Sequence, residues 1–330
     1  MERRDFLLGS AAAIGAQVLA GKGSAEVPGT DSDPGGLGTS AAAVPAYRIL
    51  GVPLRAGSLL PGNENDAQAY REAHLIDRLR AAGCTAIDDG DVAIPSYLPH
   101  HSIPPIRSWP APRIVWECVS ERVAQILQQP GQIPLLIGCD CSVVIGTTQA
   151  LQSSANAHQR EMHVIYIDGD FDDAPPEATR SNSAASCAVW LLTHESPFWA
   201  GPIMRPSQVS VVGWSNPSKA GQGKVSSTSL AELRLSGAKD AASRILKAIP
   251  DSSPILVHFD IDVLQKRELP AAYFPHDEGM TLAETANLLG VFLKDPRVRT
   301  IEISEYAALR DLNLEYCGKL IDLLAASLRR

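Results

Sequence analysis

Short apolar runs alternate with longer amphipathic stretches along most of the chain, from about residue 47 onward. Continuous apolar runs between turn residues predict strands at 47–52, 134–138, 163–167, 208–213 and 255–259. Apolar residues at intervals of three and four predict helices at 67–82, 142–153, 230–249, 282–293 and around 317–328. Strands that are apolar throughout are typical of a parallel sheet covered on both faces. The pattern therefore predicts one three-layer α/β domain over residues 46–330, without internal repeats.

The first 25 residues carry two adjacent arginines and then a long uncharged stretch. Arg3 and Arg4 precede a Phe-Leu-Leu run, and no charged residue occurs from Gly9 to Ala20. Paired arginines ahead of a weakly hydrophobic segment are typical of a twin-arginine export signal. The alternative is a disordered basic N-terminus. We expect residues 1–25 to be the signal, residues 26–45 to be a flexible linker, and the protein to be periplasmic or extracellular.

Composition narrows the classes of function. Hydrophobic residues make up 45% of the chain and charged residues 20%, which is ordinary for a folded domain. The formal net charge of −8 argues against a nucleic-acid-binding surface and suits a small cationic substrate. Six cysteines in 330 residues are too few for a disulfide scaffold. No apolar run reaches the roughly 20 residues that a membrane span requires.

Aspartates follow two of the predicted strands. Strand 163–167 is followed by Asp168, Asp170 and Asp172, and strand 255–259 by Asp260 and Asp262. The carboxyl ends of parallel strands meet at one edge, and alternate side chains of an extended segment point to one side. We therefore expect these five carboxylates to converge and to need a cation, because so many like charges repel in a buried pocket. A divalent metal ion, or two, is the expected cation. The alternative is that these residues only solvate strand ends or cap helices.

Three segments resemble motifs of the ureohydrolases, the arginase–agmatinase–formiminoglutamase family. The family motifs GGDHS, DAHxD and SFDxD are similar to Gly138-Cys139-Asp140-Cys141-Ser142, Asp168-Gly169-Asp170-Phe171-Asp172 and His258-Phe259-Asp260-Ile261-Asp262. Weaker similarities extend the resemblance over roughly residues 47–330. The resemblance implies an arginase-like α/β/α fold with a mostly parallel sheet. It also implies hydrolysis of a linear C–N bond in a guanidino or amidine compound by metal-bound hydroxide, and assembly into trimers or hexamers.

The resemblance also implies a set of metal ligands, with manganese as the usual ion. The implied ligands are Cys141, Asp168, Asp170, Asp172, Asp260 and Asp262. Cys141 and Asp170 stand where the family has histidines, so five carboxylates and a thiolate replace four carboxylates and two neutral imidazoles. Extra negative charge should tighten metal binding but weaken water activation. A thiolate ligand would favour zinc, iron or nickel.

Three alternatives to this ligand set remain open. Cys141 could stay a neutral thiol outside the shell, Asp170 could be protonated or turned away, or only one metal ion could bind. Cys139 is expected to pack in the core. A catalytically impaired member of the family, which binds one metal ion or none and acts as a ligand-binding or interaction protein, is the alternative to an enzyme.

Residues around the substrate follow the family only in part. Glu305 matches a glutamate that faces the guanidinium group, and Glu305 and Asp170 are the catalytic candidates. Asn182 and Ser183 are the remaining substrate-binding candidates, but their segment lacks the family's proton-relaying histidine. The segment after Gly213 also lacks the acidic residue that contacts the amine of amino-acid substrates in the family, so L-arginine is not the expected substrate. Of the other histidines, His258 is expected to be a core or supporting residue, and His276 could reach the site.

Overall fold

The computed structural model describes residues 45–62, 65–101, 103–138, 140–177, 179–199, 204–215 and 225–329. The expected export signal, the expected linker up to residue 44, and Cys139 lie outside the described residues. The described residues belong to one compact unit, 43–330.

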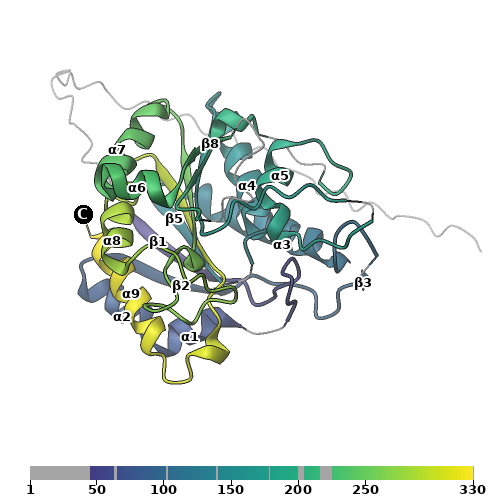
Figure 1. The fold of residues 1–330 in the computed structure, drawn as a ribbon, viewed down its shortest axis with the longest axis horizontal. Coiled ribbons are helices and arrows are strands. Elements are labelled where there is room, and N and C mark those ends of the chain that lie inside the picture. Colours follow the sequence, from purple (N-terminus) through teal and green to yellow (C-terminus); the bar gives the residue numbers. More distant parts are fainter. Residues whose placement is uncertain are drawn as a thin grey trace, which may run out of the picture. The chain divides into compact units, whose positions relative to one another are not determined.

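A parallel sheet forms the centre of this unit (Figure 1). Its strands in the described part are β1 (Ala46–Gly51), β2 (Thr85–Asp91), β5 (Gln132–Ile137), β6 (His163–Ile167), β7 (Val209–Val212), β8 (Ser226–Thr228), β9 (Ile255–Asp260) and β10 (Val298–Ser304). They are ordered β2-β1-β5-β10-β9-β6-β7-β8, and each neighbouring pair is parallel. A small antiparallel pair, β3 (His100–His101) and β4 (Trp109–Pro110), lies apart from this sheet. The predicted α/β class with a mostly parallel sheet is confirmed.

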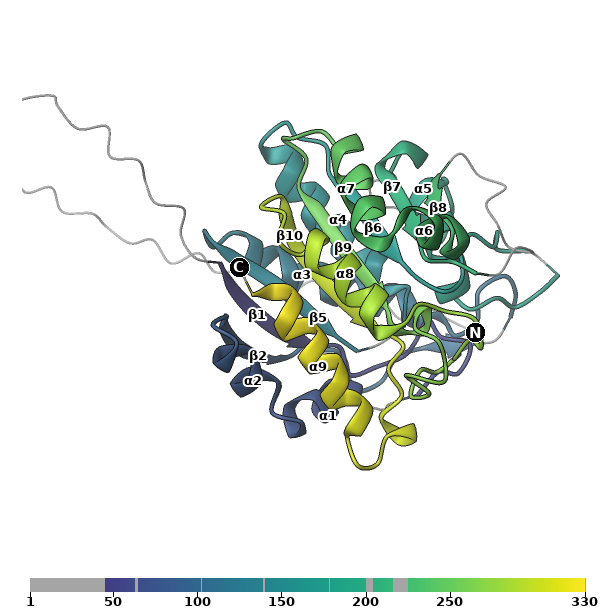
Figure 2. The ribbon, with the colours of Figure 1, turned by 60° about the vertical axis from the view of Figure 1, so that its left-hand side comes forward.

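Helices cover both faces of the sheet. The α-helices are α1 (Asp66–Glu72), α2 (Leu75–Ala81), α3 (Ala111–Leu127), α4 (Val143–Ala157), α5 (Ala188–Thr193), α6 (Leu230–Ser236), α7 (Ala238–Ala248), α8 (Leu282–Phe292) and α9 (Glu315–Leu328). Short 3₁₀ turns are η1 (Ala185–Cys187), η2 (Pro206–Gln208), η4 (Ile261–Val263) and η5 (Ala308–Arg310). Figures 1 and 2 show α3, α4 and α5 on one face, with the other α-helices on the opposite face. Among the residues that the structure describes, no helix combines the length and the apolar character of a membrane span.

Alternate residues of the central strands point into two separate hydrophobic cores. On β6, Ile165 and Ile167 belong to one core, and Val164 and Tyr166 belong to the other. All four side chains are fully buried. Burial on both faces explains why the strands are apolar throughout.

Two predicted helices are each divided in the structure. The stretch 67–82 forms α1 and α2 because His74 adopts a left-handed conformation with φ of 61°. The stretch 230–249 forms α6 and α7, which meet at Gly237 with φ of 82°. Apolar spacing continues across both breaks, so periodicity alone does not reveal them.

Candidate metal centre

The carboxyl ends of four adjacent strands, β5, β10, β9 and β6, surround a cavity of about 480 Å³. Six carboxylates line it: Asp168, Asp170, Asp172, Asp260, Asp262 and Glu305. Cys141 lies among them, and Leu59, Tyr273 and Phe274 add apolar wall. The five aspartates therefore converge, as their positions after two strands predicted.

Candidate coordinating atoms form three overlapping groups, and within each group the atoms lie no more than 4.8 Å apart. The groups are Asp168–Asp260–Asp262, Cys141–Asp260–Glu305 and Cys141–Asp168–His258, and all of these residues are buried. Asp168 Oδ1 accepts a hydrogen bond from the backbone N–H of Asp170 at 2.6 Å. Asp168 Oδ2 is buried without a hydrogen-bond partner in the described part of the chain. A buried carboxylate oxygen with no protein partner suits a cation ligand.

Repulsion among the buried carboxylates of this cluster also favours a bound cation. Burial raises the pKa of Asp168 well above its ordinary value, and the charges of Asp172, Asp262 and Asp260 raise it further. Burial likewise raises the pKa of Asp260, with Asp262 and Glu305 adding to the effect. Like charges held together in a buried site are stable only when a counter-charge is bound or protons are taken up.

Cys141 lies inside the cluster. Its thiol donates to Asp260 Oδ2 across 2.6 Å, and Ser304 Oγ lies 3.4 Å from the sulfur. Burial, followed by the charges of Asp260 and Asp168, raises the pKa of Cys141 well above the usual thiol value. Without a metal ion this shift favours the neutral thiol. Because Cys141 lies within two of the candidate ligand groups, the structure does not place it outside the cluster.

Asp170 and Asp172 line the cavity outside the three groups. Asp172 accepts a hydrogen bond from Tyr166 Oη at 2.7 Å and has a left-handed backbone, with φ of 50°. Asp170 Oδ2 lies 4.0 Å from His276 Nε2, which is also 3.5 Å from Asp262 Oδ2. The two positions at which the motifs lack histidine thus differ, because Cys141 lies within the cluster and Asp170 faces His276.

His258 supports the cluster from behind. It is completely buried, its Nδ1 lies 2.8 Å from Glu302 Oε2, and its Nε2 lies 3.3 Å from Ser304 Oγ. Its ring stacks on Tyr166 with centroids 4.4 Å apart. His258 therefore occupies the core or supporting position expected from the sequence. One of its ring nitrogens also lies within 4.8 Å of the candidate ligand atoms of Cys141 and Asp168.

The Arginase family model matches residues 45–326. The chain belongs to the arginase family. It is 24% identical to the arginase of Brucella melitensis biotype 1 over 297 residues, which cover 86% of this chain and 96% of that protein. The ureohydrolase resemblance of the motifs is therefore confirmed.

Solved structures of arginase-family proteins share the fold. The arginase of Bacillus cereus superposes with a TM-score of 0.72 and 18% identity, covering 87% of this chain and 99% of that one. The formimidoylglutamase of Bacillus subtilis superposes with a TM-score of 0.66 and 17% identity, covering 87% of each chain. These similarities confirm the predicted arginase-like fold.

Asp140, in the first family motif, positions the neighbouring loops instead of lining the cavity. Its carboxylate accepts hydrogen bonds from the backbone N–H of Gly57 at 2.9 Å and of Ser142 at 3.1 Å. A Cβ on Gly57 would lie only 2.1 Å from Ser142 Oγ, so this approach requires glycine. Through these hydrogen bonds Asp140 links the loop that follows β1 to the start of α4, which is next to Cys141 in the sequence.

That loop carries an arginine, Arg55, that contacts the candidate site and that the sequence motifs did not reveal. Arg55 is buried, and its Nη2 donates to Glu305 Oε2 at 2.8 Å. Its guanidinium carbon lies 3.1 Å from the centroid of the Tyr273 ring. Burial raises the pKa of Glu305, and the Arg55 charge counteracts part of that effect. The guanidinium group that faces Glu305 in this arginase-family chain is therefore supplied by the protein itself.

The two remaining substrate-binding candidates occupy different places. Ser183 lines the cavity, and its hydroxyl lies 2.9 Å from Ser186 Oγ. Asn182 does not line it, and its side-chain amide donates to the carbonyl of Pro175 at 3.2 Å. Only Ser183 of this pair is therefore placed to contact a molecule in the cavity.

Proposed function

We propose that this chain is a metal-dependent hydrolase that cleaves a linear C–N bond in a guanidino or amidine compound. The observation that carries the proposal is the convergence of Asp168, Asp260, Asp262 and Cys141 at the base of an acidic cavity in an arginase-family fold. These residues would hold one or two divalent metal ions. A metal ion bound there would neutralise the carboxylates and activate water for attack on the amidine carbon.

The chemical types of the candidate ligands influence which metal ion the site prefers. The arginase family implies manganese, and the carboxylate ligands suit such a hard cation. The thiol of Cys141, 2.6 Å from Asp260 Oδ2, adds a soft ligand. Deprotonation of this thiol on metal binding would favour zinc, iron or nickel over manganese.

The cavity walls favour a cationic substrate. Asp170 and Asp172 add negative charge outside the ligand groups, and Ser183 adds a hydroxyl. Because Glu305 Oε2 is already paired with Arg55, Glu305 is not a free anchor for the substrate's cation. We infer that the cationic end of the substrate lies among the cavity's carboxylates outside the ligand groups and that the ion pair of Glu305 and Arg55 forms part of the wall behind it.

Turnover of a panel of guanidino and amidine compounds tests the proposal. The protein is loaded separately with manganese, zinc, iron or nickel, and the release of urea and ammonia is measured. Asp260→Asn should abolish release, whereas Asp88→Asn, a change in a surface ion pair with Arg71, should preserve it. If metal-loaded protein hydrolyses none of the compounds, the proposal fails.

A second candidate function is a ligand-binding protein without hydrolytic activity. The specific observation that favours it is the Arg55–Glu305 ion pair, which leaves the protein's own guanidinium group against the family's guanidinium-facing glutamate. This candidate predicts calorimetrically measurable binding of a guanidino compound with no product release. Binding that requires metal and is followed by product release would exclude it.

We also propose that the protein is exported through the twin-arginine pathway. The support is the Arg3-Arg4 pair and the uncharged stretch from Gly9 to Ala20. Changing both arginines to lysine should keep the protein in the cytoplasm, as measured by cell fractionation. A change of Lys22 to Arg is the matched control and should leave export intact. Unaltered export of the double-lysine variant would contradict the proposal.

A further inference from the structure

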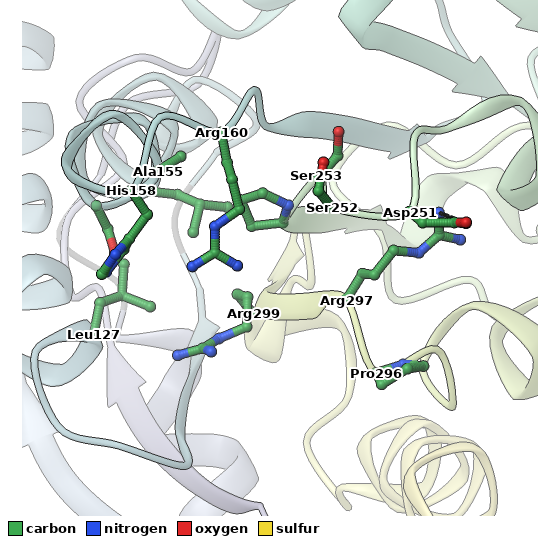
Figure 3. A pocket seen from close by; sticks show the side chains of 13 residues that line it. Leu127, Ala155, His158, Arg160, Asp251, Ser252, Ser253, Pro296, Arg297 and Arg299 are labelled. Carbon is green, nitrogen blue, oxygen red and sulfur yellow. Dashed lines mark ion pairs between the residues drawn. The ribbon is translucent and has the colours of Figure 1, made fainter.

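A second cavity, of about 250 Å³, lies at the opposite edge of the sheet (Figure 3). It is lined by the end of α4 and the residues after it, by the loop before β9, and by the start of β10. The strands β9 and β10 begin at this cavity, whereas their other ends reach the metal centre. The two cavities share no lining residue, so a ligand in this one does not depend on hydrolysis at the other.

Three arginines line this cavity, and only one of them is neutralised. Arg297 pairs with Asp295 at 2.7 Å and donates to the carbonyls of Leu246 and Ile249. The side chains of Arg160 and Arg299 have no ion pair or hydrogen bond with any residue that the structure describes. Two positive charges are thus left without a counter-charge.

The positive charges of Arg160 and Arg299 repel one another. Burial lowers the pKa of Arg299, and the nearby charge of Arg160 lowers it further. Figure 3 shows the guanidinium groups of Arg160 and Arg299 and the ring of His158 on the same side of the cavity, while Arg297 extends toward Asp251. A bound anion would relieve this repulsion.

We propose that this cavity binds a small oxyanion, either a phosphate or a carboxylate group, between Arg160 and Arg299. Guanidinium groups present paired N–H donors that match the oxygen spacing of both anions. Ser252 and Ser253 line the same cavity and add hydroxyl groups. A tetrahedral phosphate can accept from both arginines and a serine at once.

The anion would join three separate segments of the chain. Arg160 follows α4, Ser253 precedes β9, and Arg299 lies on β10. A ligand that binds only the folded state raises the stability of the protein in proportion to the logarithm of its concentration. Oxyanion binding at this edge would therefore stabilise the fold without contacting the metal centre.

Thermal unfolding of the full-length, metal-loaded protein tests the proposal. Inorganic phosphate is compared with chloride at equal ionic strength, and succinate is used to distinguish a carboxylate from a phosphate site. Whichever oxyanion binds should raise the melting temperature by about 2–4 °C at about ten times its dissociation constant. Arg160→Gln and Arg299→Gln should remove this rise. Arg113→Gln, which removes an exposed arginine on α3, should retain it.

The variants also show whether any effect arises elsewhere. Each Gln variant should stay folded and unfold no earlier than wild type in chloride, because it removes one of two repelling charges. Equal melting temperatures in phosphate, succinate and chloride would overturn the proposal. A rise that persists in both Gln variants would also overturn it, since the anion would then bind elsewhere, for instance at the metal centre.

Discussion

The Nη2 atom of Arg55 lies 2.8 Å from Oε2 of Glu305, and both side chains are almost completely buried. The two residues are 250 positions apart, at the carboxyl ends of β1 and β10. Tyr273 lies against the guanidinium group and donates its backbone N–H to the carbonyl of Glu305. Glu305 has φ of 62°, so this contact holds a backbone conformation that non-glycine residues seldom adopt.

Replacing one partner of this ion pair should destabilise the protein strongly. Arg55→Met leaves the Glu305 carboxylate buried without its cation, and we expect a loss of about 3–5 kcal/mol in the free energy of unfolding. The double change Arg55→Met with Glu305→Gln should recover at least about half of this loss, because no buried charge is then left unpaired. Urea unfolding at pH 7 in the presence of a chelator measures both values.

The matched control is an ion pair on the surface. Arg78 pairs with Asp322, and both side chains are substantially exposed. Arg78→Met should therefore change the free energy of unfolding by no more than about 1 kcal/mol. A double variant as unstable as Arg55→Met alone would show that Arg55 stabilises the fold by packing on Tyr273 instead of by neutralising Glu305.

Metal binding should stabilise the fold. Divalent metal at 100 times its dissociation constant should raise the free energy of unfolding by about 2.7 kcal/mol over chelated protein. Asp168→Asn should remove most of this gain, because Asp168 belongs to two of the three ligand groups. Asp240→Asn, an exposed change on α7, should leave it intact. Differential scanning calorimetry with and without metal measures the difference, and an unchanged gain in Asp168→Asn would contradict the assignment.

Replacing Asp170 with the histidine of the family motif should increase hydrolysis. Asp170 adds one of six carboxylates to the cavity, and Asp170→His removes that charge. A less negative site makes the metal a stronger Lewis acid, so we expect about tenfold faster turnover, equivalent to about 1.4 kcal/mol in the barrier. Steady-state kinetics on the best substrate of the panel measures it. Asp173→His, outside the cavity lining, is the control, and unchanged or slower turnover by Asp170→His would refute the charge argument.

Sequence patterns predicted five strands of the sheet, β1, β5, β6, β7 and β9, because burial on both faces makes them apolar throughout. The strand 163–167 has the same bounds in the structure, and four others agree within two residues. Strand β10 was not predicted, since Arg299 and Glu302 interrupt its apolar run. Glu302 is nevertheless fully buried because it pairs with His258 on the neighbouring strand. Such a partner is defined only by the tertiary fold.

The sequence predicted those residues of the candidate site that directly follow strands. Asp168, Asp260 and Asp262 converge because β6 and β9 are adjacent parallel strands. Arg55 could not be found in this way, because its loop has no periodicity and its partner is distant in sequence. The useful signal was its position shortly after β1, at the same edge of the sheet as the aspartates.

His163 should make the stability of the protein depend on pH in the mildly acidic range. Burial, together with the charge of Arg297, lowers the pKa of His163 to about 4 in the folded protein, while an unfolded histidine titrates near 6.5. The unfolded chain therefore binds the proton first as the pH falls. The contribution of His163 to stability is complete above about pH 6.5 and is lost progressively between pH 6.5 and 4.

Between pH 7 and pH 5, this titration should lower the free energy of unfolding by about 2 kcal/mol. His163→Gln, which can still hydrogen-bond to Ser210, should show a pH dependence smaller by that amount, whatever its stability at pH 7. His74→Gln, in an exposed position, should keep the wild-type pH dependence. Urea unfolding at the two pH values measures all three proteins. Equal pH dependence in wild type and His163→Gln would show that the His163 imidazole is charged in the folded protein or does not titrate in this range.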